Sequence, residues 1–76
     1  MSKRMVRQGL RYRATISLGL LERLASNELI AKKFADLGFK DVEVSGQGAD
    51  RVAEALWPLA DAEGEMPSQV VEFKEV

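Results

Sequence analysis

Cysteine and histidine are both missing from this 76-residue chain. Without cysteine the chain forms no disulfide and has no thiolate nucleophile, a composition that suits the reducing cytoplasm. Without histidine it has neither the commonest general base nor the commonest metal ligand, which excludes histidine-based triads and the usual zinc sites. The carboxylates show no spacing typical of an acid–base pair or a tight calcium loop. We therefore expect no enzymatic activity, no cofactor and no metal.

Long apolar runs are missing as well. Residues 14–21 are mostly apolar, but Thr15, Ser17 and Gly19 interrupt them and charged residues follow at once. This stretch is shorter than the roughly 18 apolar residues of a membrane span and is not typical of a secretory signal, so no membrane is expected as a partner. A single aromatic residue, Tyr12, accompanies the basic start of the chain, so no stacking platform for single-stranded nucleic acid is visible.

The chain contains enough apolar material for one small core. Apolar residues make up 46% of the sequence and charged residues 30%, which is typical of a folded, soluble domain. A single core stabilises so short a chain only marginally, and a sheet of few strands has open edges. A partner would therefore add much to its stability.

Charge is distributed unevenly along the chain. Five basic residues precede the first acid, Glu22, and they are Lys3, Arg4, Arg7, Arg11 and Arg13. The other six of the 11 basic residues share the remainder of the chain with all 12 acids, which gives residues 14–76 a net charge of −6. A basic start is thus joined to an acidic body.

This asymmetry predicts an arm followed by a domain. We expect residues 1–9 to form a flexible basic arm and residues 10–76 to form a single small domain. Lys3, Arg4 and Arg7 are the candidate contacts for a polyanion such as nucleic acid, bound through counterion release. The alternative is a solvated tail, because the acidic body would repel a nucleic acid that came close.

Periodicity predicts three strands and a first helix. Alternation of apolar and polar residues predicts strands over residues 10–18, 41–45 and 69–76. Helical spacing predicts a helix over 27–37, or from residue 20 at its earliest, with Ser26 or Asn27 as its N-cap and Gly38 after its end.

A second helix is predicted after Asp50, because Val52 and Leu56 recur at helical spacing, and Pro58 would kink or end it near Trp57. The element order is then strand, helix, strand, helix, strand. This is an α/β fold (an α+β two-layer sandwich), ferredoxin-like in character, with both helices on one face of a three-stranded sheet. A right-handed crossover would make the first two strands parallel, and the direction of the last strand stays open.

Two sets of residues are candidates for binding a protein partner. Arg11 and Arg13 would project from the uncovered face of the sheet, where glutamates of neighbouring strands offer pairing partners. Trp57, the sole tryptophan, is a candidate interface anchor, since buried tryptophan dominates many interfaces. The alternative for Trp57 is a place in the core or at its rim.

The Gly46-Gln47-Gly48 turn resembles the opening of a phosphate-binding fingerprint. Gly46, Gly48 and Arg51 are therefore candidates for an anion or nucleotide site. The alternative is a tight turn in which the glycines supply positive φ. That alternative is favoured because Asp50 places negative charge where a phosphate would lie.

The segment from Tyr12 to Leu18, the helix that follows it, and then Leu37, Gly38 and Phe39 together resemble the first half of SPOR domains. This resemblance covers about residues 10–45 and implies a ferredoxin-like, peptidoglycan-binding module. The second half departs from the family, which has another strand before its second helix, so no binding residues are carried over.

The function expected from these observations is that of a small non-enzymatic protein-interaction module. It would associate with itself as a homodimer or larger oligomer, or serve as an accessory subunit of a larger assembly. The first alternative is a nucleic-acid or other polyanion binder that uses the basic arm. The second is an anion or nucleotide binder at the glycine turn.

Overall fold

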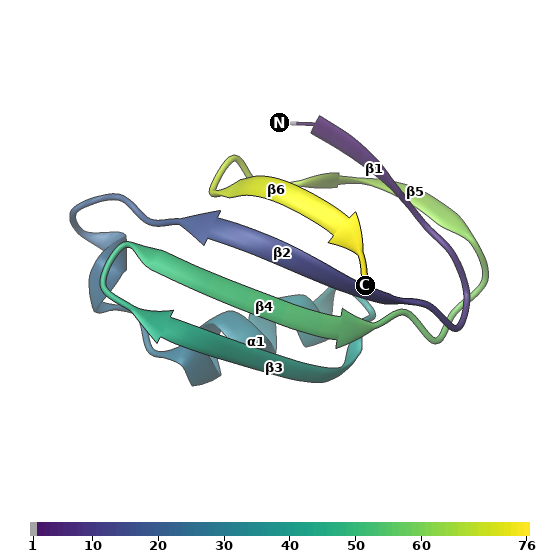
Figure 1. Ribbon diagram of the computed structural model, residues 1–76, viewed down its shortest axis with the longest axis horizontal. Coiled ribbons are helices and arrows are strands. Elements are labelled where there is room, and N and C mark those ends of the chain that lie inside the picture. Colours follow the sequence, from purple (N-terminus) through teal and green to yellow (C-terminus); the bar gives the residue numbers. More distant parts are fainter. Residues whose placement is uncertain (1) are drawn as a thin grey trace.

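The computed structural model describes residues 2–76, which contain six strands in two antiparallel sheets, one 3₁₀ turn and one α-helix (Figure 1). The strands are β1 (Ser2–Val6), β2 (Arg11–Ser17), β3 (Lys40–Gln47), β4 (Asp50–Leu56), β5 (Ala62–Met66) and β6 (Val70–Glu75). The 3₁₀ turn is η1 (Glu22–Leu24) and the α-helix is α1 (Asn27–Asp36). The main sheet has the order β3-β4-β2-β6, and β1 pairs with β5 in a separate two-stranded sheet.

Several predicted elements are confirmed. β2 lies within the predicted first strand, and Tyr12, Ala14 and Ile16 are its buried residues, as the alternation indicated. The side chain of Ser26 is the N-cap of α1, since its Oγ accepts a hydrogen bond from the backbone N–H of Leu29 at 3.1 Å. β3 spans the predicted strand over residues 41–45, and β6 lies within the predicted strand over residues 69–76.

The ferredoxin-like order of strand, helix, strand, helix and strand is wrong, because the segment predicted as a second helix is β4. Arg51, Ala53, Ala55 and Trp57 alternate there as buried residues. The segment fits both a helical and a strand period, and the helix propensity of alanine is a weak preference that tertiary context overrides. In this chain β4 supplies the strand with which both β2 and β3 pair.

The predicted strand directions change with it. The first two predicted strands, β2 and β3, are not parallel neighbours, because each pairs antiparallel with β4 between them. β6, whose direction the sequence left open, runs antiparallel to β2.

The N-terminal segment pairs with residues 62–66, a segment outside the strands and helices that the sequence predicts. Residues 2–6 form β1, which runs antiparallel to β5 along its whole length. Lys3 lies opposite Glu65 in this register, and Val6 is buried in the core. The expected flexible arm is therefore a strand here, and its positive charge lies beside negative charge of the same chain.

Aromatic side chains form a connected cluster within the core. The ring of Phe39 meets Phe34, Trp57 and Phe73 edge to face, at centroid distances of 5.8, 5.0 and 6.4 Å. Tyr12 stacks on Phe73 at 5.1 Å. These contacts join α1, β2 and β6 through the residue that precedes β3.

One helix does not cover the whole core side of the main sheet. α1 contacts β3 and, to a smaller extent, β4. Neighbouring strands lie about 4.8 Å apart and a helix with its side chains is about 10–12 Å wide, so α1 covers roughly half of a four-stranded sheet. Figure 1 shows α1 behind β3 and β4, with β1 and β5 on the side of β6. Part of the core side next to β2 and β6 is left open.

Within residues 2–76, no helix has both the length and the apolar character that crossing a membrane requires.

Candidate functional site

The open part of the core side forms a cavity of about 460 Å³, called the apolar hollow below. One wall is α1, from which the lining residues are Leu29, Ile30, Lys33, Phe34 and Leu37. Their spacing places them on one helix face. The sheet and the turn before β6 complete the lining with Ile16, Leu18, Pro67, Gln69 and Val70. Leu29 and Leu37 are 46% and 49% exposed, so apolar surface continues from the hollow to its rim.

Residues 20–24, called the leucine turn below, stand beside this hollow. Leu20, Leu21 and Leu24 are 75%, 87% and 89% exposed. Glu22 in the same turn lines the hollow, as does Ala25 just after it. The leucine turn therefore forms one rim of the hollow while its three leucines face solvent.

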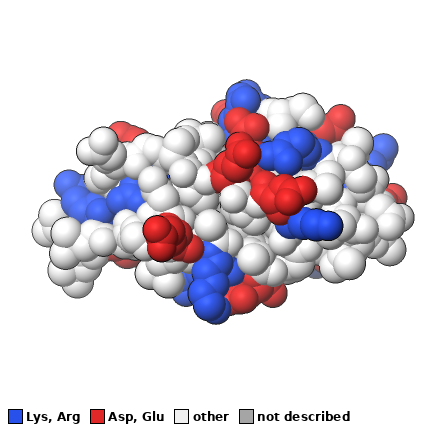
Figure 2. Space-filling model, turned by 90° about the horizontal axis from the view of Figure 1, so that it is seen from below, with Lys and Arg blue, Asp and Glu red and all other residues white. Residues whose placement is uncertain are grey.

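Charge on the surface near this site is mixed in sign. Figure 2 shows acidic and basic residues scattered over one face, and at the end where Figure 1 places the loop after β2 a basic patch lies among uncharged surface. The exposed leucines of this end therefore lie close to charged side chains.

Arg51 holds the leucine turn against the β3–β4 hairpin. Its Nη2 donates to the backbone oxygen of Arg23 at 2.9 Å, and its Nη1 donates to the backbone oxygen of Ala25 and to Oδ1 of Asn27, both at 2.8 Å. Its Nε donates to the backbone oxygen of Gly48 at 3.1 Å. The side chain is buried with the residue only 5% exposed, and its charge is met by these oxygens rather than by a carboxylate within residues 2–76.

The three candidates for an anion site do come together at this hairpin. Gly46 lies near the end of β3 and Gly48 in the turn itself, both with positive φ, and Asn27 Nδ2 donates to the backbone oxygen of Gly46 at 3.2 Å. The donors of Arg51 point to oxygens of the chain itself. This arrangement matches the structural alternative, in which the glycines make a tight turn.

Glu22 fixes the other end of the leucine turn. Its Oε1 accepts a hydrogen bond from the backbone N–H of Gly19 at 2.8 Å, and its Oε2 accepts one from Nε2 of Gln69 at 2.6 Å. The hydrogen bond from Gly19, and after it the one from Gln69, hold the pKa of Glu22 below its usual value. The turn is thus tied to the segment before β6.

This lowered pKa predicts a pH-dependent stability. The carboxylate of Glu22 stabilises the fold fully above the ordinary glutamate pKa of about 4.3, and the stabilisation is lost as the pH falls through the lower folded pKa. In urea unfolding, wild type should lose more stability between about pH 6 and pH 3 than Glu22→Gln does. Glu75→Gln, at an exposed glutamate on β6, should keep the wild-type loss. An equal loss of stability in wild type and in both variants would contradict the assignment of the pH dependence to Glu22.

The residues predicted for a protein interface lie apart from the hollow. Arg13 projects from the outer face of the sheet, and its Nε donates to Oε2 of Glu54 on β4 at 3.0 Å. Arg11 lies on the same face, opposite Leu56. Trp57 is only 7% exposed and its Nε1 donates to the backbone oxygen of Ala60 at 2.9 Å, which places it in the core.

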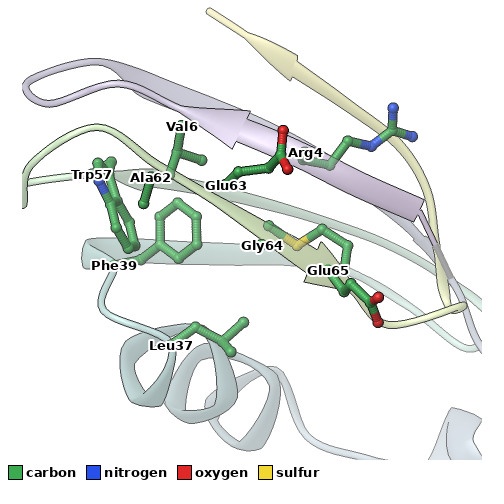
Figure 3. A pocket seen from close by; sticks show the side chains of 10 residues that line it. Arg4, Val6, Leu37, Phe39, Trp57, Ala62, Glu63, Gly64 and Glu65 are labelled. Carbon is green, nitrogen blue, oxygen red and sulfur yellow. The ribbon is translucent and has the colours of Figure 1, made fainter.

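The candidate polyanion contacts lie at the start of the chain, and one of them borders a smaller cavity. Lys3 and Arg7 are exposed, and Arg4 is half-buried. Arg4 lines a cavity of about 220 Å³ between β1, β5 and the end of α1. Figure 3 shows Phe39 and Trp57 side by side in this cavity, with the guanidinium of Arg4 directed away from them. The volume is below the roughly 300–1,000 Å³ of most ligand pockets.

Sequence reasoning missed the leucine turn as a site. It gave residue 20 as the earliest start of the first helix and assigned no role to the three leucines. The available signal was the density of leucine, three in five residues, directly after a glycine that ends a strand.

Among residues 2–76 there is no cluster of three or more Asp or Glu side chains placed to hold a metal ion. No family model, no curated protein and no solved structure matches the chain.

Proposed function

We propose that this chain is a small protein-interaction module whose contact surface is the leucine turn together with the apolar hollow. The observation that carries the proposal is the exposure of Leu20, Leu21 and Leu24 beside an apolar cavity of about 460 Å³. Single exposed leucines are common on soluble proteins, but three of them next to an apolar cavity mark an interaction surface.

Energetics support this use of the surface. Fully burying one leucine side chain contributes about 1.5–3 kcal/mol, so burying three contributes roughly 5–9 kcal/mol before the costs of association. A micromolar complex requires about 8 kcal/mol net. The three leucines alone therefore do not reach that value, and burial of the apolar lining of the hollow has to supply the rest of the binding free energy.

Rigidity supports it as well. Arg51 donates to the backbone oxygen of Arg23 within the leucine turn, and Glu22 accepts a hydrogen bond from Gln69. Further hydrogen bonds of Arg51 to Ala25 and Asn27 hold the residues that follow the turn. A surface that is already ordered loses little conformational entropy when a partner binds. The geometry favours a docking surface over a loop that only solvates the chain.

The two other functions expected from the sequence have less support. Lys3 and Arg4 lie on β1, which pairs with β5 and its Glu63 and Glu65, so these two cations do not form an isolated basic arm. Arg51 is satisfied by oxygens of its own chain. Neither nucleic-acid binding nor anion binding is therefore the preferred proposal.

The test compares three tagged proteins as baits in extracts of cells that produce the native chain. They are wild type, the leucine-turn variant L21S/L24S, and the control V71S, which alters a residue 59% exposed on β6 and outside the hollow. Proteins bound by wild type and V71S but not by L21S/L24S, the native chain itself included, support the proposal. Equal recovery by all three baits would contradict it.

A further inference from the structure

We infer that the partner of this surface is a second copy of the chain, with the leucine turn of each copy seated in the apolar hollow of the other. This inference rests on the proposed function and names its partner. It requires that one surface carry both a protruding apolar segment and a cavity able to receive it, which is the condition for a twofold interface.

The positions of the turn and the hollow meet this condition. Glu22 and Ala25 line the hollow, whereas Leu21 and Leu24 in the same short segment point to solvent. The protruding segment and the cavity are therefore immediate neighbours at one end of the molecule. A twofold axis at that end brings both leucine turns to both hollows at once, so every contact is made twice.

The charges at the rim are complementary for the same arrangement. The leucine turn carries Glu22, and the helix wall of the hollow carries Lys33. A leucine turn seated in the hollow of the other copy approaches that helix wall, so the Glu22 of each copy comes near the Lys33 of the other. Opposite charges at the edge of an apolar contact fix its orientation more than its strength.

A second copy also fits the surface better than a lipid bilayer does. Anionic membranes attract clusters of basic residues around an apolar anchor. Here the hollow carries one acidic and one basic residue, and the chain as a whole has a net charge of −1. α1 covers only part of the core side of the main sheet, and the second copy would cover the part that α1 leaves open.

A dimer in which the leucine turn of each copy enters the hollow of the other makes a prediction that other dimers do not make. L21S/L24S removes the leucine turn as a ligand and leaves the hollow intact. L29D places a carboxylate at the mouth of the hollow and leaves the leucine turn intact, and the helix tolerates an acid in its first turn. In a mixture, the intact turn of one variant meets the intact hollow of the other, so one of the two contacts is restored.

Sedimentation measurements on a labelled variant mixed with an unlabelled one test this directly. Each variant alone should dimerise at least about tenfold more weakly than wild type, and the mixture should form a heterodimer more tightly than either variant forms a homodimer. Thermal unfolding of both variants establishes that they fold, which the exposure of the altered leucines favours, and V71S should dimerise as wild type does.

Three outcomes would overturn the inference. If folded L29D dimerises as wild type does, the leucines contact something other than the hollow. If each variant alone is monomeric and their mixture forms no heterodimer, the leucine turn of one copy does not contact the hollow of the other. If wild type is monomeric at every concentration while the leucine-dependent capture described above persists, the proposed function stands and the second copy is not the partner.

Discussion

Replacing Arg51 by methionine should unfold a large part of the protein population. Methionine keeps most of the apolar stem but provides no donor for the backbone oxygens of Arg23, Ala25 and Gly48 or for Oδ1 of Asn27. Each acceptor that loses its donor where water cannot replace it costs about 1–3 kcal/mol, so the loss of four hydrogen bonds costs several kcal/mol together. A domain of this length has roughly 4–11 kcal/mol of stability, so the loss takes a large share of it.

The measurement is the free energy of unfolding from urea titrations of Arg51→Met and of the control Arg13→Met. Arg13 donates to Glu54 on the outer face, where the two side chains are 41% and 33% exposed. Exposed pairs of this kind contribute at most about 1 kcal/mol. If the two variants lose similar amounts of stability, the hydrogen bonds of Arg51 do not hold the leucine turn and the hairpin together.

Gly46→Ala should be the second most damaging change, and Gly48→Ala should be much milder. Gly46 has φ +100°, and a Cβ there would overlap the backbone oxygen of Asp50 and lie 3.1 Å from Cα of Arg51. Positive φ costs a residue with a Cβ about 1–2 kcal/mol, and forced overlap adds about 1–3 kcal/mol. Gly46→Ala should therefore lower the free energy of unfolding by roughly 2–5 kcal/mol in total, through strain in the β3–β4 hairpin that carries Arg51.

Gly48 is the matched comparison within the same turn. Its φ is +66°, and a Cβ there would meet no heavy atom within 4 Å, so only the backbone cost of about 1–2 kcal/mol applies. Urea midpoints of the two variants should therefore differ clearly, with Gly46→Ala the less stable. Equal midpoints, or the reverse order, would contradict the close approach of Gly46 to Asp50.

Some of the fold could be predicted because local signals and tertiary structure agree. The alternation through β2 identified its buried face, and Ser26 marked the start of α1. The segment that became β4 was ambiguous, because Val52 and Leu56 fit a helix while Ala53, Ala55 and Trp57 fit a strand. The hairpin turn Gly48-Ala49 was the deciding signal, since a two-residue loop with glycine first and positive φ joins antiparallel strands.

Other parts had no local signal. The β5 sequence Ala-Glu-Gly-Glu-Met is poor in strand-forming residues, and it becomes a strand only because β1 pairs with it from the other end of the chain. Two of the residues predicted for binding, Arg51 and Trp57, are buried and donate hydrogen bonds to oxygens of the chain itself. The exposure of the leucine turn depends on how much of the sheet α1 covers, which no short window of sequence reveals.

The most direct test of the account is the molar mass of the native chain in solution, measured by light scattering over a range of concentrations at low and high salt. We predict a dimer with twice the 8.4 kDa of the chain that persists at high salt, because most of the contact is apolar. A mass of 8.4 kDa at every concentration would contradict a contact between copies. A dimer that dissociates in high salt would contradict an apolar contact and assign the association to charge.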